Sequence, residues 1–353
     1  MSAESTLQST CANSRMVSPF ATAGEHRSGC DGGVTPQSLG AGGQVRGQNV
    51  FVCVAKRRNR AGAKSKRLCG DIMTGNQEKV LSVLACQIDV PEDMRSAEDR
   101  DHHLARIAEL IDGALSDRTA EVVMLPELSS VSYSRHCFSE PEIFAEDAEG
   151  RSFQILARVA KKRRVHILYG APCRREDGGL SISQFVIDRE GRPIGAFDKL
   201  HLAQFGASME KDYFSPGKRL LVLDIKGFRL APVICYDLRF AGLATELALG
   251  RNVDAILHSV AFCRDESFYS WRPFVITRAL ENEVYWLSLN RAGEKFGASI
   301  FCPPWVDEKN RETVCGAGEE LIWFDISKEV ISQARHRYTF RNDRLANYSA
   351  LPE

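Results

Sequence analysis

The sequence predicts an α/β fold in which sheets are covered by helices in one layered domain. Two observations lead to this prediction. From residue 79 onward, short apolar runs of strand length alternate with segments whose apolar residues recur at helical spacing, and turn residues separate them. The chain of 353 residues is 44% hydrophobic and 26% charged, which is ordinary for a protein with a packed core.

The first half of this region alternates strands with helices. The expected elements are strands at 80–88, 122–125 and 165–169, helices at 102–115 and 153–161, and a hairpin of 181–187 with 193–197. In the first helix Leu104, Ile107, Ile111 and Leu115 lie on one face, which is typical of a helix packed on a sheet. Gly170 is expected to end the strand that begins at residue 165.

The second half of the region continues the same alternation. The expected elements are strands at 253–258, 284–289, 298–302 and 321–324, helices at 241–249 and 268–282, and a hairpin of 220–225 with 230–234. Lys226 and Gly227 form the expected turn of this hairpin, and Gly250 ends the first of the two helices. The sequence contains neither an internal repeat nor a Gly-rich phosphate-binding loop.

The composition of residues 1–72 predicts a low-complexity basic segment without a packed core. The globular domain is expected to comprise residues 79–353. Residues 1–70 carry ten Lys and Arg against three acids, an excess of +7. Because the formal net charge of the chain is zero, the remainder carries −7, which argues against a nucleic-acid-binding body. The basic run at 56–67 is typical of a solvated tail, with contact to RNA or an anionic surface as the alternative.

The cysteines and the hydropathy indicate a cytoplasmic location. Eleven cysteines are scattered along the chain, without a CxxC pair and without a Cys/His cluster at zinc spacing, so we expect reduced thiols and no metal. No apolar run approaches 18 residues, so we expect no membrane contact. Import into an organelle through residues 1–72 is the alternative to a cytoplasmic location.

Cys235 is the first candidate for chemistry. The apolar run 230–234 ends abruptly at this cysteine, and polar residues follow at once. The ends of strands in open α/β sheets are where such folds expose functional groups. A packed core cysteine is the alternative, and position alone does not decide between the two.

Glu127 and Lys199 lie at two other strand ends. Glu127 follows an apolar strand and Pro126, and a carboxyl group among apolar residues suits proton transfer near neutral pH. Lys199 lies between Phe197 and Leu200, where a half-buried ammonium could hold a developing oxyanion. Taken alone, Glu127 is better explained as a surface acid or an acid at a helix N-terminus, and Lys199 as a solvated lysine. Together with a thiol, they supply what the hydrolysis of an amide or nitrile through a thioester requires.

Two histidines offer a competing arrangement. His201 is two residues after Lys199, and His258 ends a predicted strand. A Cys/His pair is therefore an alternative to the thiol, ammonium and carboxyl group. A packing or supporting role is the expectation for both histidines.

The motifs together resemble those of the carbon–nitrogen hydrolase (nitrilase) superfamily. They are Leu125-Pro-Glu-Leu128, Asp198-Lys-Leu-His-Leu202, Ile234-Cys-Tyr-Asp-Leu-Arg-Phe240, Arg278-Ala-Leu-Glu-Asn282, Asn290-Arg-Ala-Gly293 and Gly297-Ala-Ser299. The resemblance covers about residues 79–340 and implies an α-β-β-α sandwich. It also implies a homodimer or larger homo-oligomer, in which a C-terminal segment at 329–347 crosses the interface.

The resemblance assigns roles to the site residues. It implies Cys235 as the nucleophile, Glu127 as the general base and acid, and Lys199 as the stabiliser of the oxyanion. The backbone N–H of Tyr236 would be a second oxyanion donor, and Glu210 would position the lysine or the substrate. The resemblance implies neither a metal nor an organic cofactor.

The residues around Cys235 favour one branch of the superfamily. The sequence Cys235-Tyr-Asp-Leu-Arg-Phe-Ala241 resembles the omega-amidase and deaminated-glutathione amidase branch. We therefore expect a small carboxamide as substrate, with Arg239 and Tyr133 as substrate contacts and Arg264 as a further candidate cation. The segment 266–271 departs from the sequence usual in that branch, which leaves the substrate open.

Two alternatives to the amidase remain at this point. The same chemistry serves a nitrilase or an N-carbamoyl amidohydrolase. The fold could also belong to a binding or scaffold protein that catalyses nothing, against which the complete set of three site residues argues.

Overall fold

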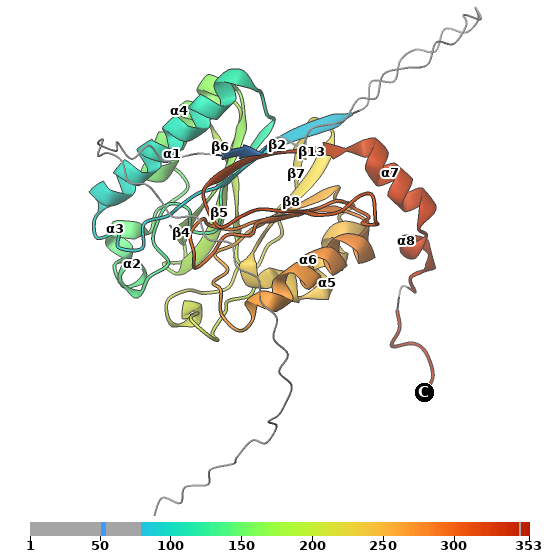
Figure 1. The fold of residues 1–353 in the computed structure, drawn as a ribbon. Helices are drawn as coiled ribbons and strands as arrows, with labels where there is room; N and C mark the ends of the chain where they lie inside the picture. The colour runs from blue at the N-terminus through green and yellow to red at the C-terminus, as the bar shows by residue number, and fades with distance from the viewer. Residues whose placement is uncertain (1–50, 54–78, 346) are drawn as a thin grey trace, which may run out of the picture. The chain divides into compact units, whose positions relative to one another are not determined.

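The computed structural model describes residues 51–53, 79–345 and 347–353, and contains two β-sheets with helices on both outer faces (Figure 1). One sheet has the strand order β1-β13-β2-β3-β4-β5-β6, and the other has the order β12-β11-β10-β9-β8-β7. Helices α1 and α4 cover the first sheet, whereas α5 and α6 cover the second (Figure 1). The α-β-β-α sandwich expected from the sequence is therefore confirmed.

The first sheet is mixed. Its strands are β1 (Phe51–Cys53), β2 (Val80–Gln87), β3 (Val122–Met124), β4 (His166–Arg174), β5 (Leu180–Ile187), β6 (Pro193–Asp198) and β13 (Glu320–Ser327). Strands β2, β3 and β4 are parallel, and β5, β6 and β13 each run antiparallel to a neighbour. The covering helices are α1 (Ala97–Asp117) and α4 (Arg151–Arg163). The predicted apolar face of α1 is confirmed, because Leu104, Ile107, Ile111 and Leu115 are all buried against this sheet.

The second sheet carries three parallel central strands. Its strands are β7 (Leu223–Ile225), β8 (Phe228–Ile234), β9 (Ala255–Ser259), β10 (Tyr285–Leu289), β11 (Ile300–Cys302) and β12 (Thr313–Val314). On its outer face lie α6 (Phe268–Asn282), α5 (Ala241–Thr245) and the π-helical turn η3 (Glu246–Gly250). Trp271, Val275 and Ala279 of α6 are buried against the sheet. The β7–β8 hairpin turns at Lys226 and Gly227 as predicted, both with positive φ.

The inner faces of the two sheets pack against each other. Leu81 and Val83 of β2 and Met124 of β3 share one core cluster with Phe228 of β8 and Leu257 of β9. At the strand ends, the Ser259 hydroxyl donates a hydrogen bond of 2.9 Å to the Leu125 carbonyl. The packing therefore brings the carboxyl ends of β3 and β9 together, although they belong to different sheets.

Some boundaries differ from the predicted ones. The helix expected at 102–115 begins at Ala97, because Ser96 caps it and exchanges hydrogen bonds with Asp99 in a capping box. The prediction that Gly170 ends its strand is wrong, since β4 continues to Arg174. A Cβ atom at Gly170 would lie 2.3 Å from the backbone nitrogen of Leu128, so this glycine permits the close approach of a neighbouring loop.

Several short elements were not predicted. They are α2 (Arg135–Ser139), α3 (Pro141–Phe144), the 3₁₀ turns η1 (Glu210–Asp212) and η2 (Cys235–Arg239), α7 (Lys328–Arg337) and α8 (Phe340–Asp343). Most are too short for a helical period to emerge from the sequence. Of the predicted N-terminal segment 1–72, the structure describes only β1, and the basic run 56–67 lies outside the described residues.

Candidate functional site

Cys235 occupies the junction between β8 and the turn η2. Its backbone has a φ of +42°, in the left-handed region that residues other than glycine rarely adopt. Neighbouring groups hold this conformation. The Ile234 N–H donates to Asp237 Oδ2 at 3.1 Å, and His258 Nε2 lies 3.0 Å from the Cys235 carbonyl oxygen. The turn thus presents a half-buried thiol at the end of a buried strand.

Glu127 lies in the loop after β3, and its side chain is buried. Leu128 after it has a φ of +49°, and the loop rests on β4 at Gly170. The buried guanidinium of Arg291 holds the loop, donating to the carbonyl oxygens of Glu127 at 3.2 Å, Leu128 at 2.7 Å and Val131 at 3.0 Å. Three carbonyl acceptors on one rigid fork fix the backbone from which the carboxyl group projects.

Lys199 follows β6 and is completely buried. Its Nζ lies 2.8 Å from Glu127 Oε1 and 2.7 Å from Glu210 Oε1. Glu210 comes from η1, where its Oε2 accepts a hydrogen bond from the Ala203 N–H at 2.8 Å and its Oε1 accepts one from the Tyr133 hydroxyl at 3.0 Å. One ammonium is thus shared by two buried carboxylates.

The charges of this cluster shift each other's titration. Burial alone would lower the pKa of Lys199, but the charges of Glu127 and Glu210 raise it well above its usual value. Burial raises the pKa of the Cys235 thiol well above its usual value, and the charge of Glu127 raises it further. At neutral pH the cysteine is therefore a thiol beside an ammonium, and it needs a base before sulfur can attack.

The backbone of Ala261, just beyond β9, links Glu127 with Cys235. Its N–H donates to Glu127 Oε2 at 2.8 Å, and the same residue's backbone stabilises the thiolate form of Cys235. The structure therefore brings Glu127, Lys199, Glu210 and Cys235, from four separate stretches of sequence, into one cluster. A thiol, two carboxylates and an ammonium group thus lie in one cluster, which is the set of groups that the resemblance led us to expect.

A narrow cavity of about 40 Å³ opens at Cys235. Its lining residues are Tyr133, Ala203, Phe205, Ala207, Ser208, Cys235, Tyr236, Ala261, Phe262, Cys263, Asp265 and Ser267. Of the two expected substrate contacts, Tyr133 lines this cavity and Arg239 does not. The Arg239 guanidinium lies 4.7 Å from the ring centroid of Phe274 and 5.8 Å from that of Phe262, so it contacts a ring of the cavity wall without lining the cavity itself.

The two histidines make other contacts. His201 Nδ1 lies 2.7 Å from Asp237 Oδ1, and its ring stacks on Phe240. The His258 ring contacts the carbonyl oxygen of Cys235, and its Nδ1 accepts a hydrogen bond from the Trp286 indole N–H at 3.2 Å. Because an indole N–H only donates, Nε2 carries the proton and donates to Cys235. Both histidines support the turn that carries Cys235.

Sequence reasoning missed the supporting roles of Arg291, Arg278 and Asp237. Arg291 and Arg278 lie in motifs that the sequence presented, but the pattern did not reveal which carbonyl groups they bind. Arg278 donates to the carbonyl oxygens of Leu238 at 3.0 Å and Arg239 at 3.1 Å, which secures η2. The available signal was an arginine within a largely apolar stretch of sequence, because a guanidinium that becomes buried requires several acceptors.

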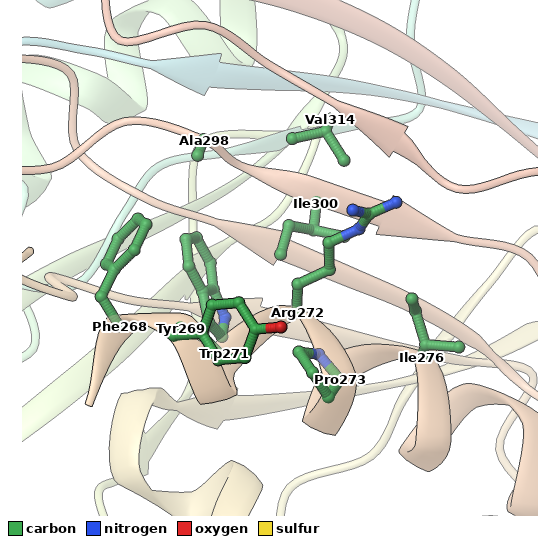
Figure 2. A pocket seen from close by; sticks show the side chains of 9 residues that line it. All are labelled: Phe268, Tyr269, Trp271, Arg272, Pro273, Ile276, Ala298, Ile300 and Val314. Atoms are coloured by element: carbon green, nitrogen blue, oxygen red, sulfur yellow. The ribbon is translucent and has the colours of Figure 1, made fainter. Parts of the chain in front are cut away.

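A second cavity, of about 360 Å³, lies away from these residues, between α6 and the strands β11 and β12 (Figure 2). Figure 2 shows Phe268, Trp271 and Ile276 of α6 below Ile300 and Val314. None of the predicted site residues lines this second cavity. Among the described residues, no group of three or more His, Cys, Asp and Glu side chains is arranged to hold a metal ion. None of the described helices is long and apolar enough to span a bilayer, and the cytoplasmic location stays a prediction.

The comparison with protein families shows to which family this chain belongs. The family model described as carbon-nitrogen hydrolase matches residues 82–335, more than half of the chain. The chain belongs to the carbon–nitrogen hydrolase family. The resemblance and the enzyme class predicted from the sequence motifs are therefore confirmed.

Several proteins that are similar to this carbon–nitrogen hydrolase carry the name of an amidase. Omega-amidase NIT2-B of Xenopus laevis is 26% identical over 251 residues, covering 67% of this chain and 88% of the relative. The 2-oxoglutaramate amidase of Bacillus subtilis (strain 168) is 31% identical over 193 residues, covering 53% of this chain and 71% of the relative. The crystal structure of Saccharomyces cerevisiae Nit3, a member of branch 10 of the nitrilase superfamily, shares the fold with a TM-score of 0.64 at 22% identity, covering 77% of this chain and 97% of that one.

Proposed function

We propose that this hydrolase cleaves the C–N bond of a small carboxamide through a cysteine thioester and releases ammonia. The observation that carries the proposal is the sharing of Lys199 Nζ between Glu127 and Glu210 beside the thiol of Cys235. The names of the omega-amidase relatives support an amide as the substrate.

In the first half-reaction, Glu127 takes the thiol proton as Cys235 Sγ bonds to the amide carbon. The oxyanion that forms accepts hydrogen bonds from Lys199 Nζ and the backbone N–H of Tyr236. Donors aimed at a developing charge in a buried site lower a barrier by several kcal/mol, roughly 3–4 for each donor. Protonated Glu127 then gives its proton to the departing nitrogen, and the C–N bond breaks to leave ammonia and a thioester.

In the second half-reaction, water attacks the thioester carbonyl and Glu127 takes a proton from it. The tetrahedral intermediate collapses, the C–S bond breaks, and the proton returns to the sulfur of Cys235. The products are a carboxylic acid and the free enzyme. Glu210 supports both steps by holding Lys199 in place, since its own carboxylate is fixed by Ala203 and Tyr133.

The proposal is tested by ammonia release from a panel of small amides, nitriles and N-carbamoyl amino acids. Cys235→Ser is expected to lower amide turnover by at least about a thousandfold, and mass spectrometry of acid-quenched enzyme should find the acyl group on the peptide that contains Cys235. Cys173→Ser makes the same change at a half-buried cysteine on β4 and should retain activity.

The outcomes separate the alternatives. Ammonia from nitriles alone would identify a nitrilase, and turnover of ureido acids alone an N-carbamoyl amidohydrolase. Unchanged amide turnover in Cys235→Ser would contradict the thioester mechanism. If none of the compounds releases ammonia and Cys235 is alkylated no faster than the buried Cys86, the protein would be a binding or scaffold protein.

We also propose that the enzyme forms a homodimer in which a second copy covers α6 and the cavity between α6 and β11. Tyr269 of α6 is 90% exposed, and the cavity is lined mainly by apolar side chains (Figure 2). A second copy is the expected occupant because the family resemblance implies paired sandwiches. Light scattering should give twice the mass of one chain, with Tyr269→Glu shifting it towards the monomer. Ile143→Glu, on α3, should leave it unchanged, and a wild-type monomer would contradict the proposal.

A further inference from the structure

The cavity at Cys235 contains one charged side chain at its wall, and that side chain is acidic. Among the described lining residues, Asp265 is the only Asp, Glu, Lys, Arg or His. It comes from the loop between β9 and α6, at the rim opposite the loop 203–208. A bound amide whose far end reaches this rim therefore meets a carboxylate.

The cations that could counter this charge are directed elsewhere. Lys199 is completely buried and already bonded to two carboxylates. The Arg239 guanidinium lies over Phe274, and the Arg264 guanidinium lies over Phe268 while its Nε donates to the Phe296 carbonyl at 2.8 Å. Neither arginine is part of the cavity lining, although the Arg239 guanidinium also lies 5.8 Å from the ring centroid of Phe262, which does line it.

Local contacts fix the Asp265 carboxylate at the cavity mouth. Its Oδ1 accepts hydrogen bonds from the Ser267 N–H at 2.8 Å and the Ser267 hydroxyl at 2.7 Å. Its Oδ2 lies towards the opposite loop, where a Cβ atom on Gly206 would be only 2.8 Å away. Oδ1 is therefore held by Ser267, while Oδ2 lies close to Gly206 in the facing loop 203–208.

The rest of the cavity wall also suits a positive charge. Phe205, Tyr236, Phe262 and Tyr133 contribute aromatic rings, and the Phe205 and Tyr236 rings lie 5.2 Å apart between centroids. The faces of such rings attract ammonium groups, with tyrosine and phenylalanine both effective. Aromatic rings offer no comparable attraction to a carboxylate.

We infer that this enzyme prefers amides whose far end carries a positive charge over amides that carry a carboxylate, and that Asp265 reads this charge. The inference rests on the proposed amide hydrolysis and names its substrate class. Opposite charges in contact at a half-buried site change an affinity by tenfold or more. An amide such as 2-oxoglutaramate, which gives the Bacillus subtilis relative its name, bears a carboxylate and would be repelled here.

Three amides with the same chain length test the inference. In 3-aminopropanamide, butanamide and succinamate the same two-carbon chain ends in an ammonium, a methyl group and a carboxylate. With ammonia release as the readout and Cys235→Ser as the blank, kcat/KM should fall in that order. The cation-to-anion ratio is expected to be at least about a hundredfold, because the two charges act in opposite directions.

Variants assign the preference to its residue. Asp265→Asn keeps the acceptor for Ser267 and removes the charge, so the cation-to-anion ratio should fall by at least about tenfold. Glu266→Gln removes an exposed acid that does not line the cavity, and because solvent screens its charge the ratio should change far less than in Asp265→Asn. Wild-type enzyme that hydrolyses succinamate faster than 3-aminopropanamide, or an unchanged ratio in Asp265→Asn, would overturn the inference.

A second measurement separates this inference from the proposed reaction. Alkylation of Cys235 by neutral iodoacetamide and anionic iodoacetate is followed by peptide mass spectrometry, with rates relative to a free thiol in solution. The anionic reagent should be disfavoured in wild type, and the gap should narrow in Asp265→Asn. Inert amides with this gap present would refute the proposed function alone, whereas active enzyme without the gap would refute the charge preference alone.

Discussion

At the scale of single residues, the site depends on backbone conformations that its side chains do not favour. Cys235, which carries the thiol, and Leu128, which follows Glu127, both have a positive φ. Left-handed backbone costs a residue with a Cβ atom about 1–2 kcal/mol and persists only where neighbours enforce it. Here His258, Asp237 and Arg291 supply that enforcement through hydrogen bonds to the backbone. The strained backbone thus lies at the thiol, which lines the cavity, and directly after the residue that carries the buried carboxyl group.

The strain at Cys235 can be measured as stability. Cys235→Gly and Cys235→Ala both remove the thiol, but only glycine adopts a φ of +42° without strain. We expect the glycine variant to have a free energy of unfolding about 1 kcal/mol higher than the alanine variant. Urea denaturation of the two proteins gives the difference directly. Equal midpoints would show that the turn relaxes once the thiol is absent.

At the scale of elements, each reactive group follows a strand, and a loop or turn aims it. Glu127 follows β3, Lys199 follows β6 and Cys235 follows β8. The first two strands belong to one sheet and the third to the other, so the site lies where the two sheets meet. Strand ends are rigid because the ladder behind them is hydrogen-bonded, whereas the following residues are free to adopt special conformations. This combination holds a group in place while leaving it accessible.

The contact between β4 and the loop of Glu127 leads to a second prediction. Gly170→Ala places a Cβ atom 2.3 Å from the Leu128 nitrogen, so the loop must move. We expect the free energy of unfolding to fall by about 2–3 kcal/mol and amide turnover to fall with it.

Gly113→Ala is the matched control for this change. The added methyl group would have no neighbour within 4 Å, and Gly113 lies inside α1. The variant should therefore be more stable by about 0.5–1 kcal/mol, because alanine favours the helix. Turnover that survives in Gly170→Ala would show that the position of the Glu127 loop is not critical.

At the scale of the whole molecule, two buried histidines link stability to pH. Burial lowers the pKa of His258 to about 3 and that of His103 to about 4, below the usual 6.5. As pH falls below about 6.5, the unfolded chain takes up these protons before the folded protein does. The free energy of unfolding should therefore be highest near neutral pH and should decrease down to about pH 4.

A histidine variant isolates this effect. Between pH 7 and pH 4.5, His258 contributes a loss of about 2–3 kcal/mol. His258→Gln should therefore lose less stability over this range than wild type does, by a similar amount. His102→Gln, at an exposed position on α1, should follow the wild-type curve. Denaturant titrations at several pH values give the free energy of unfolding of each protein. Parallel plots of this free energy against pH for all three proteins would contradict the prediction.

The sequence predicted the parts of the fold that depend on local patterns. Sharp ends of apolar runs located the segments of Glu127, Lys199 and Cys235, because burial imposes that pattern on the chain itself. The role of Gly170 was predicted wrongly, because a glycine is needed there for a contact with a loop more than forty residues away in the sequence. The position of Arg239 was likewise beyond prediction, since the stacking of its guanidinium on Phe274 depends on how α6 packs. Contacts between distant segments leave no period in a sequence.

The strand order of the first sheet has a consequence for the synthesis of the protein. Strand β13 pairs along its whole length with β2, although more than 230 residues of chain separate them. A ribosome delivers β13 long after β2. A nascent chain stopped before residue 320 would already contain every reactive group discussed above, yet one edge of β2 would lack a partner. The enzyme therefore completes this sheet only after residues 320–327 have been synthesised.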